Sequence, residues 1–194
     1  MLSLALVMLL AGPAPLVDAV KAGDRAAALA LLAQRSDVNL PEDDGTTALH
    51  WAVNRQDVEL VDRLLRAGAT VNVANAYGAT PMSEAAVTGH PALLERLLAA
   101  GADVESPNAD GQTALMVVAR TGSVDAARLL IDRGANVNAV EQWRGQTALM
   151  WAAAQGQAAM VKELVSRGAD VNARSTVNNW QRQVTAASDI GVAP

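Results

Sequence analysis

The sequence of 194 residues contains no cysteine, no phenylalanine and a single tyrosine. Without cysteine, neither a disulfide framework nor a zinc site built on thiolates is possible. Large aromatic side chains are too few to fill a core, so the hydrophobic 51% of the sequence must pack mainly as Ala, Leu and Val. The formal net charge of −5 has the wrong sign for a nucleic-acid-binding surface, which excludes that class of partner.

One short motif occurs four times at a nearly constant interval. It consists of a glycine, a threonine two residues later and a run of small apolar residues, and its threonines are Thr47, Thr80, Thr113 and Thr147. The intervals between them are 33, 33 and 34 residues, which is typical of proteins built from stacked repeats. The core of such a protein grows along one axis rather than around a centre.

Each copy of the motif predicts two helices separated by a short break. The threonine is a candidate N-cap for the first helix, because its hydroxyl can accept a free backbone N–H. The first helices are predicted over 48–55, 81–88, 114–121 and 148–155, and the second over 58–67, 92–100, 124–133 and 158–167. Glycine follows the first helix in three copies, whereas Gln56 stands there in the first copy and predicts a strained loop.

The connection after the second helix also repeats. Each second helix carries a pair of apolar residues near its end and stops at Gly-Ala, and a Val-Asn pair follows. Glu105 replaces the asparagine once. Because polar side chains on such loops hold turns through hydrogen bonds to the backbone, we expect the connection at Glu105 to differ locally.

These motifs together, from Leu16 to about Arg174, resemble the ankyrin repeat. The resemblance implies an all-α fold, an ankyrin-repeat solenoid of stacked helix-turn-helix units with projecting hairpin loops. It divides the chain into a degenerate N-terminal capping repeat at 15–42 and full repeats at 43–75, 76–108, 109–142 and 143–174. The family's proline is present only as Pro81 and its histidine only as His50, so the hydrogen bonds of that histidine are expected in one repeat.

The two ends of the chain each have two interpretations. Residues 2–11 form an apolar run too short to span a bilayer, with the length of a signal-peptide core. Segment 1–14 therefore predicts export to the periplasm or the extracellular space. The alternatives are a cytoplasmic protein in which this segment packs on the first repeat, and a scaffold tethered to a membrane by the retained segment. Residues 175–194 are either an irregular tail that caps the last repeat or, as we favour, the start of a truncated further unit in a longer array.

Residues suited to catalysis or metal binding do not form a recognisable set. His50 and His90 occupy different positions of different repeats, and both match family positions with structural roles. The repeated glycines occur once per turn, as backbone geometry requires, and form no phosphate-binding loop. The sequence therefore predicts a protein that is not an enzyme and has no cofactor and no metal.

Candidate partner-binding residues follow from the resemblance, because ankyrin repeats bind partners on a concave face of inner helices and hairpin tips. The corresponding outward site of the four inner helices is Trp51, Glu84, Val117 and Trp151. Further candidates on the helices and tips are Asn54, Arg55, Tyr77, Val87, Arg120, Trp143, Arg144 and Gln155. Trp and Tyr contribute strongly to interface energies, which favours binding. The alternative is that each Trp only closes a packing gap over an Ala-rich helix.

The first functional hypothesis is a non-enzymatic protein–protein interaction module, anchored on its partner by Trp51 and Trp151. The second is that these repeats regulate or anchor a larger protein that is enzymatic or tethered to a membrane. In both, the partner is a protein whose identity does not follow from the sequence.

Overall fold

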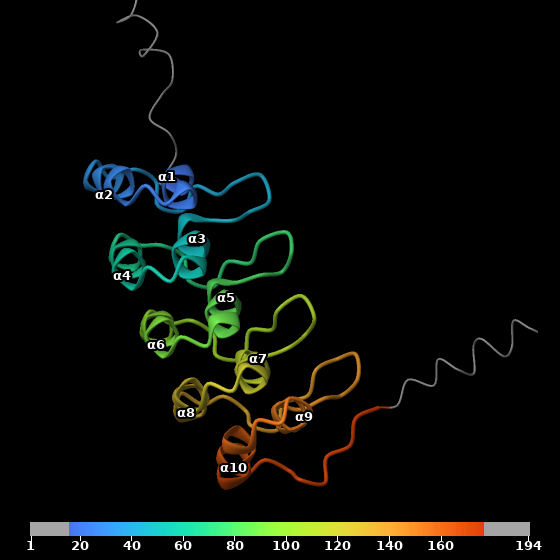
Figure 1. Cartoon of the computed structure of the whole chain (residues 1–194). Coiled ribbons are helices and arrows are strands. Elements are labelled where there is room, and N and C mark those ends of the chain that lie inside the picture. The colour runs from blue at the N-terminus through green and yellow to red at the C-terminus, as the bar shows by residue number, and fades with distance from the viewer. Residues whose placement is uncertain (1–15, 177–194) are drawn as a thin grey trace, which may run out of the picture.

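Residues 16–176 are described by a computed structural model, and within this range the chain forms ten α-helices and no strand. The helices lie in two columns, with hairpin loops projecting beside one of them (Figure 1). The inner helices, next to the loops, are α1 (Leu16–Ala22), α3 (Ala48–Asn54), α5 (Pro81–Thr88), α7 (Ala114–Thr121) and α9 (Ala148–Ala154). The outer helices are α2 (Arg25–Ala33), α4 (Val58–Arg66), α6 (Pro91–Ala99), α8 (Val124–Asp132) and α10 (Ala158–Ser166).

This arrangement confirms the predicted all-α solenoid, and the helices of the full repeats begin and end within one residue of their predicted bounds. Aliphatic side chains at equivalent positions of successive repeats form one continuous core. On the inner helices the fully buried positions include Ala52, Ala85, Val118 and Ala152. On the outer helices they include Leu64, Leu97, Leu130 and Leu164. Small residues let the inner helices approach closely, and each buried leucine contributes about 2 kcal/mol to folding.

Threonine hydroxyls cap two of the inner helices as predicted. The hydroxyl of Thr80 accepts the N–H of Ser83 at 3.1 Å, and the hydroxyl of Ser83 accepts the N–H of Thr80 at 2.9 Å. Thr147 accepts the N–H of Met150 at 3.3 Å. The prediction is wrong for Thr113, which makes no cap hydrogen bond and whose backbone φ of −73° differs from the −108° of Thr80.

His50 joins its repeat to the next one. Its Nδ1 atom accepts the N–H of Thr47 at 3.2 Å, and its Nε2 atom lies 3.0 Å from the carbonyl oxygen of Ala79. Both contacts are satisfied when the proton is on Nε2. Burial lowers the pKa of the imidazole, although the hydrogen bond to Ala79 acts in the opposite direction. At the equivalent positions, Ser83 bonds within its own repeat and Met116 is buried in the core.

Among residues 16–176, two residues other than glycine adopt the left-handed backbone conformation. Gln56 has a φ of 57°, which confirms the strain predicted where other repeats have glycine. Arg35 has a φ of 58°. The sequence analysis missed Arg35, which stands in the first repeat where Gly68 and Gly101 stand in the next two.

Asparagine side chains connect the loops of successive repeats. The Nδ2 atoms of Asn39, Asn72 and Asn138 donate to glycine carbonyls of the following repeat at 2.9–3.1 Å. Their Oδ1 atoms accept a backbone N–H two residues beyond each glycine, at 2.7–2.9 Å. We call these contacts the asparagine ladder.

Glu105 occupies the third of the four positions of the asparagine ladder and keeps only half of the contacts that the asparagines make. Its Oε1 atom accepts the N–H of Asn136 at 2.7 Å, as the asparagines do with their partners. An ionised carboxylate has no proton to donate to the carbonyl of Gly134, so the second hydrogen bond is lost. The local difference predicted at Glu105 is therefore confirmed.

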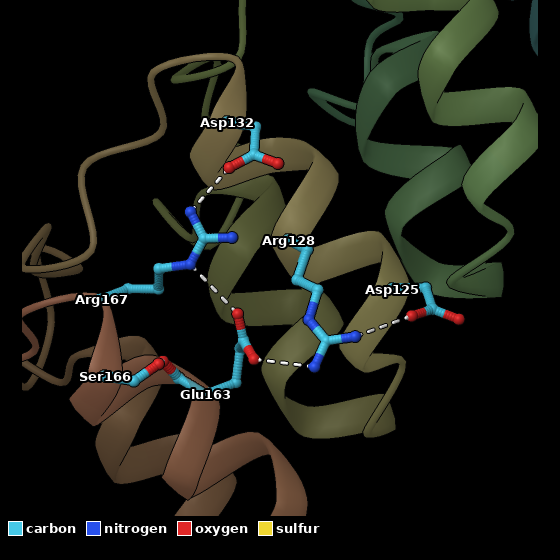
Figure 2. A network of polar contacts seen from close by, with 6 residues as sticks. All are labelled: Asp125, Arg128, Asp132, Glu163, Ser166 and Arg167. Carbon is cyan, nitrogen blue, oxygen red and sulfur yellow. Dashed lines mark hydrogen bonds and ion pairs between the residues drawn. The ribbon is translucent and has the colours of Figure 1, made fainter.

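Ion pairs connect the outer helices, and Figure 2 shows the densest group. Glu163 on α10 accepts hydrogen bonds from Arg128 on α8 at 2.9 Å and from Arg167 at 3.1 Å. Arg167 also reaches Asp132 at 2.6 Å. The pKa of Glu163 is lowered, chiefly by the hydrogen bond from Arg128. Such exposed pairs contribute little individually, so they support the stack without forming its core.

Several sequence predictions concern residues that the structure does not describe. Segment 1–14 and nearly all of the tail 175–194 lie outside residues 16–176. The predictions of a signal peptide, a membrane tether and a truncated further unit therefore stay predictions. Among residues 16–176, no helix combines the length and the apolar character needed to cross a membrane.

The asparagine ladder yields a test by substitution. We expect Glu105→Asn to restore the missing donor to the carbonyl of Gly134 and to raise the free energy of unfolding by about 1 kcal/mol. Urea denaturation followed by circular dichroism measures the change. The reverse substitution Asn72→Glu is the matched control and should lower stability by a similar amount. A Glu105→Asn variant no more stable than the parent would contradict the assigned role of the ladder.

Candidate protein-binding site

The hairpin loops form a regular row beside the inner helices (Figure 1). Each loop is closed by a backbone hydrogen bond of 2.8–3.1 Å, donated in turn by the N–H of Glu42, Asn75, Asn108 and Glu141. A further bond of 2.7 Å, from the N–H of Ala76 to the carbonyl of Asp44, connects the first two loops. We call the surface made by these loops and the inner helices the inner face.

Most of the candidate binding residues lie at the surface of the inner face. Tyr77 and Trp143 are 70% and 69% exposed. Trp51, Glu84 and Trp151 are half-buried. The remaining exposed candidates are Asn54, Arg55, Val87, Arg120, Arg144 and Gln155.

The predicted exposure of Val117 is wrong, because its side chain is only 1% exposed. Val117 lies on α7, which has α5 on one side and α9 on the other. A valine side chain extends less far from its helix than the Glu84 and Trp151 side chains at equivalent positions. It therefore ends within the core instead of reaching the surface.

A side chain near the end of one inner helix contacts a side chain in the middle of the next inner helix, and this contact recurs along the stack. The ammonium of Lys21 lies 5.2 Å from the ring centre of Trp51, and the guanidinium carbon of Arg120 lies 5.8 Å from that of Trp151. These separations are within the range of cation–π attraction. Asn54 occupies the position of Lys21 one repeat later and donates to Glu84 at 3.3 Å. The repeat therefore brings the same two positions together in each pair of neighbouring repeats, and the residue types at these positions determine whether a cation–π contact or a hydrogen bond forms.

A carboxylate completes the contact at Trp51. The indole Nε1–H donates to Glu42 at 2.6 Å, and the Lys21 ammonium donates to the other oxygen of Glu42 at 2.6 Å. The pKa of Glu42 is lowered, chiefly by the hydrogen bond from Lys21 and then by that from Trp51. An adjoining cleft of about 470 Å³ includes Asp18, Glu42, Asp43 and Asp44 in its lining, so this end of the inner face is acidic.

The equivalent carboxylate has a different role at the other end of the inner face. Glu141 is 4% exposed and accepts the backbone N–H groups of Trp143, Arg144 and Gln146 at 2.5, 2.8 and 3.0 Å. Burial raises the pKa of Glu141, but these hydrogen bonds outweigh it and the pKa is lowered. Glu141 therefore holds the enlarged hairpin tip in shape. The Nε1–H of Trp151 is buried and has no hydrogen-bond partner among residues 16–176.

Two clefts bring most of the candidate residues together. A cleft of about 190 Å³ is lined by Asp44, Thr46, His50, Trp51, Asn54, Asn75, Tyr77 and Glu84. A second cleft, of about 350 Å³, is lined by Asp110, Gln112, Glu141, Trp143, Arg144, Gln146 and Trp151. The other five candidates, Arg55, Val87, Val117, Arg120 and Gln155, line neither cleft. Arg55 instead donates to the carbonyl of Lys21 at 3.2 Å.

Sequence reasoning missed three residues that shape this surface: Lys21, Glu42 and Glu141. A signal for the two glutamates was present, because they stand where the middle hairpins have Asn75 and Asn108. The inner face offers aromatic rings, cations and amide groups, which suit recognition. Within residues 16–176, no three His, Asp or Glu side chains are placed to hold a metal ion together.

The difference between the two tryptophans predicts unequal effects of the same substitution. Trp51→Phe removes a hydrogen bond to an ionised carboxylate, whereas Trp151→Phe removes an N–H that has no partner. We expect Trp51→Phe to cost about 1 kcal/mol more stability than Trp151→Phe, measured by urea denaturation of both variants. Equal losses, or a larger loss for Trp151→Phe, would contradict the two environments described.

Comparison with known proteins agrees with the repeat architecture. A family model described as ankyrin repeats (3 copies) matches residues 16–108 and 85–175. No curated protein matches the chain significantly. The family match covers most of the sequence and coincides with the stacked helices of the structure. The chain therefore belongs to the ankyrin-repeat family.

Proposed function

We propose that this chain is a protein-interaction module that binds a partner protein on its inner face. Ankyrin repeats are generally modules for protein–protein interaction. The observation that carries the proposal is the position of the aromatic residues. Among residues 16–176, every Trp and the only Tyr lie on the inner face, as Trp51, Tyr77, Trp143 and Trp151, and the buried core is aliphatic.

Binding on this surface requires little rearrangement of the chain. The half-buried Trp51 is held by Glu42 and Lys21, and Arg120 lies over Trp151. Side chains that are already ordered lose little entropy when a partner binds, so more of the contact energy becomes affinity. The exposed rings of Tyr77 and Trp143 add apolar area near both clefts.

Charge on the inner face orients the partner. Asp18, Asp43 and Asp44 lie near Trp51, whereas Arg120 and Arg144 lie near Trp151. The Trp51 end has an excess of acidic groups, whereas at the Trp151 end the two arginines stand beside Asp110 and Glu141, and this asymmetry of charge favours one direction of docking over the reverse. The Trp51 end suits a basic part of the partner, and the Trp151 end suits an acidic part.

The family is typically non-enzymatic, and the proposal needs neither catalysis nor a cofactor. Export of the chain belongs to the same proposal, supported only by the apolar run at residues 2–11. Membership of a longer array likewise rests on the sequence pattern after Arg174.

Affinity capture with quantitative mass spectrometry tests the proposal. The double variant Tyr77→Ala, Trp143→Ala removes both exposed rings without opening the core, so we expect an intact fold and at least about tenfold less captured partner. The matched control is Arg66→Ala, an exposed position on outer helix α4, which should capture as much as the parent. Unchanged capture by the double variant, with unchanged circular dichroism, would overturn the proposal.

A further inference from the structure

The two tryptophan sites of the inner face are structural equivalents three repeats apart. The first consists of Lys21, Glu42 and Trp51, and the second has Arg120, Glu141 and Trp151 at the same positions of their repeats. In both, a cation from one inner helix lies over the indole ring of the next, at 5.2 and 5.8 Å. The first site can therefore serve as a template for the second.

The first site contains a carboxylate from the chain itself. One oxygen of Glu42 accepts from the Lys21 ammonium and the other from the Trp51 indole, both at 2.6 Å. The carboxylate thus balances the charge of the cation and satisfies the indole N–H in one contact.

The second site has the cation and the indole but lacks this carboxylate. Glu141 accepts three backbone N–H groups of the enlarged hairpin tip, so its oxygens are committed to the loop. The indole N–H of Trp151 is left buried without a partner, which is energetically costly. Within residues 16–176, neither Arg120 nor Arg144 forms an ion pair.

We infer that the Trp151 site binds an aspartate or glutamate side chain of the partner protein, in the place that Glu42 fills at Trp51. The inference rests on the proposed function and specifies the partner's chemistry at one point. A carboxylate supplies both missing elements, an acceptor for the indole N–H and a counter-charge for Arg120. The neighbouring cleft of about 350 Å³ gives the side chain room to enter.

The surroundings of the site are compatible with an incoming carboxylate. The negative charge of Glu141 is offset by its three N–H donors, and Asp110 is an exposed residue of the cleft lining. Trp151 lines this cleft together with the exposed side chains of Trp143 and Arg144, so a carboxylate that enters the cleft approaches the buried indole nitrogen through changes of side-chain rotamer alone. The extra residue in this hairpin tip distinguishes it from the other three.

A capped synthetic peptide with the sequence of residues 40–44 is a suitable probe. It contains Glu42, which is the carboxylate that contacts Trp51 at the equivalent site, together with Asp43 and Asp44. Titrated into the full chain labelled with ¹⁵N-tryptophan, it should shift the indole signal of Trp151 and leave that of Trp51 in place. The same peptide with all three carboxylates replaced (Glu42→Gln, Asp43→Asn and Asp44→Asn) should bind at least about tenfold more weakly. Trp151→Phe should weaken binding of the parent peptide to the same degree, followed through the Trp143 signal, whereas Trp51→Phe should not.

No shift of Trp151 at millimolar peptide, or equal binding of the acidic peptide and the peptide without carboxylates, would overturn the carboxylate site. A peptide that shifts Trp143 equally in the parent and in Trp151→Phe would also overturn it and leave the inner face as the binding surface. The proposed function fails separately, when the Tyr77→Ala, Trp143→Ala variant captures as much partner as the parent.

Discussion

Contacts between equivalent positions of neighbouring repeats hold this chain in its fold. Its helices are seven to nine residues long, and isolated helices of that length are not stable in water. The continuous aliphatic core and the asparagine ladder supply the missing stability, because each repeat packs only against its neighbours. A defect such as Glu105 therefore weakens one junction and leaves the others intact.

The same spacing places the functional side chains. Because the stack repeats its geometry, Lys21 lies over Trp51 as Arg120 lies over Trp151, and the two sites differ in what the equivalent glutamate contacts. Glu42 satisfies the first indole, while Glu141 supports a hairpin tip and leaves the second indole unpaired. At Trp51 the indole and the cation thus share a carboxylate of the chain itself, whereas at Trp151 neither has one.

The period and the turn motifs predicted the fold well, because glycine, threonine and leucine at fixed intervals constrain both helix ends and the core. The side-chain partners on the inner face were not predictable in the same way. Val117 was expected at the surface, but its burial depends on how far its neighbours extend. The different directions of Glu42 and Glu141 depend on contacts across repeats and on one extra loop residue. The left-handed Arg35 was missed because the first repeat lacks the glycine that marks that turn elsewhere.

The contact between Trp51 and a carboxylate, and its absence at Trp151, are tested most directly by NMR. The indole N–H signals of the free protein are followed in a pH titration, under conditions where the protein stays folded. The lowered pKa of Glu42 means that its carboxylate loses its charge only below the usual carboxyl range. The account predicts that the Trp51 signal shifts in that acidic window, that Glu42→Gln abolishes the shift, and that the Trp151 signal does not follow it. A Trp51 signal that does not titrate, or a Trp151 signal that moves as far, would contradict it.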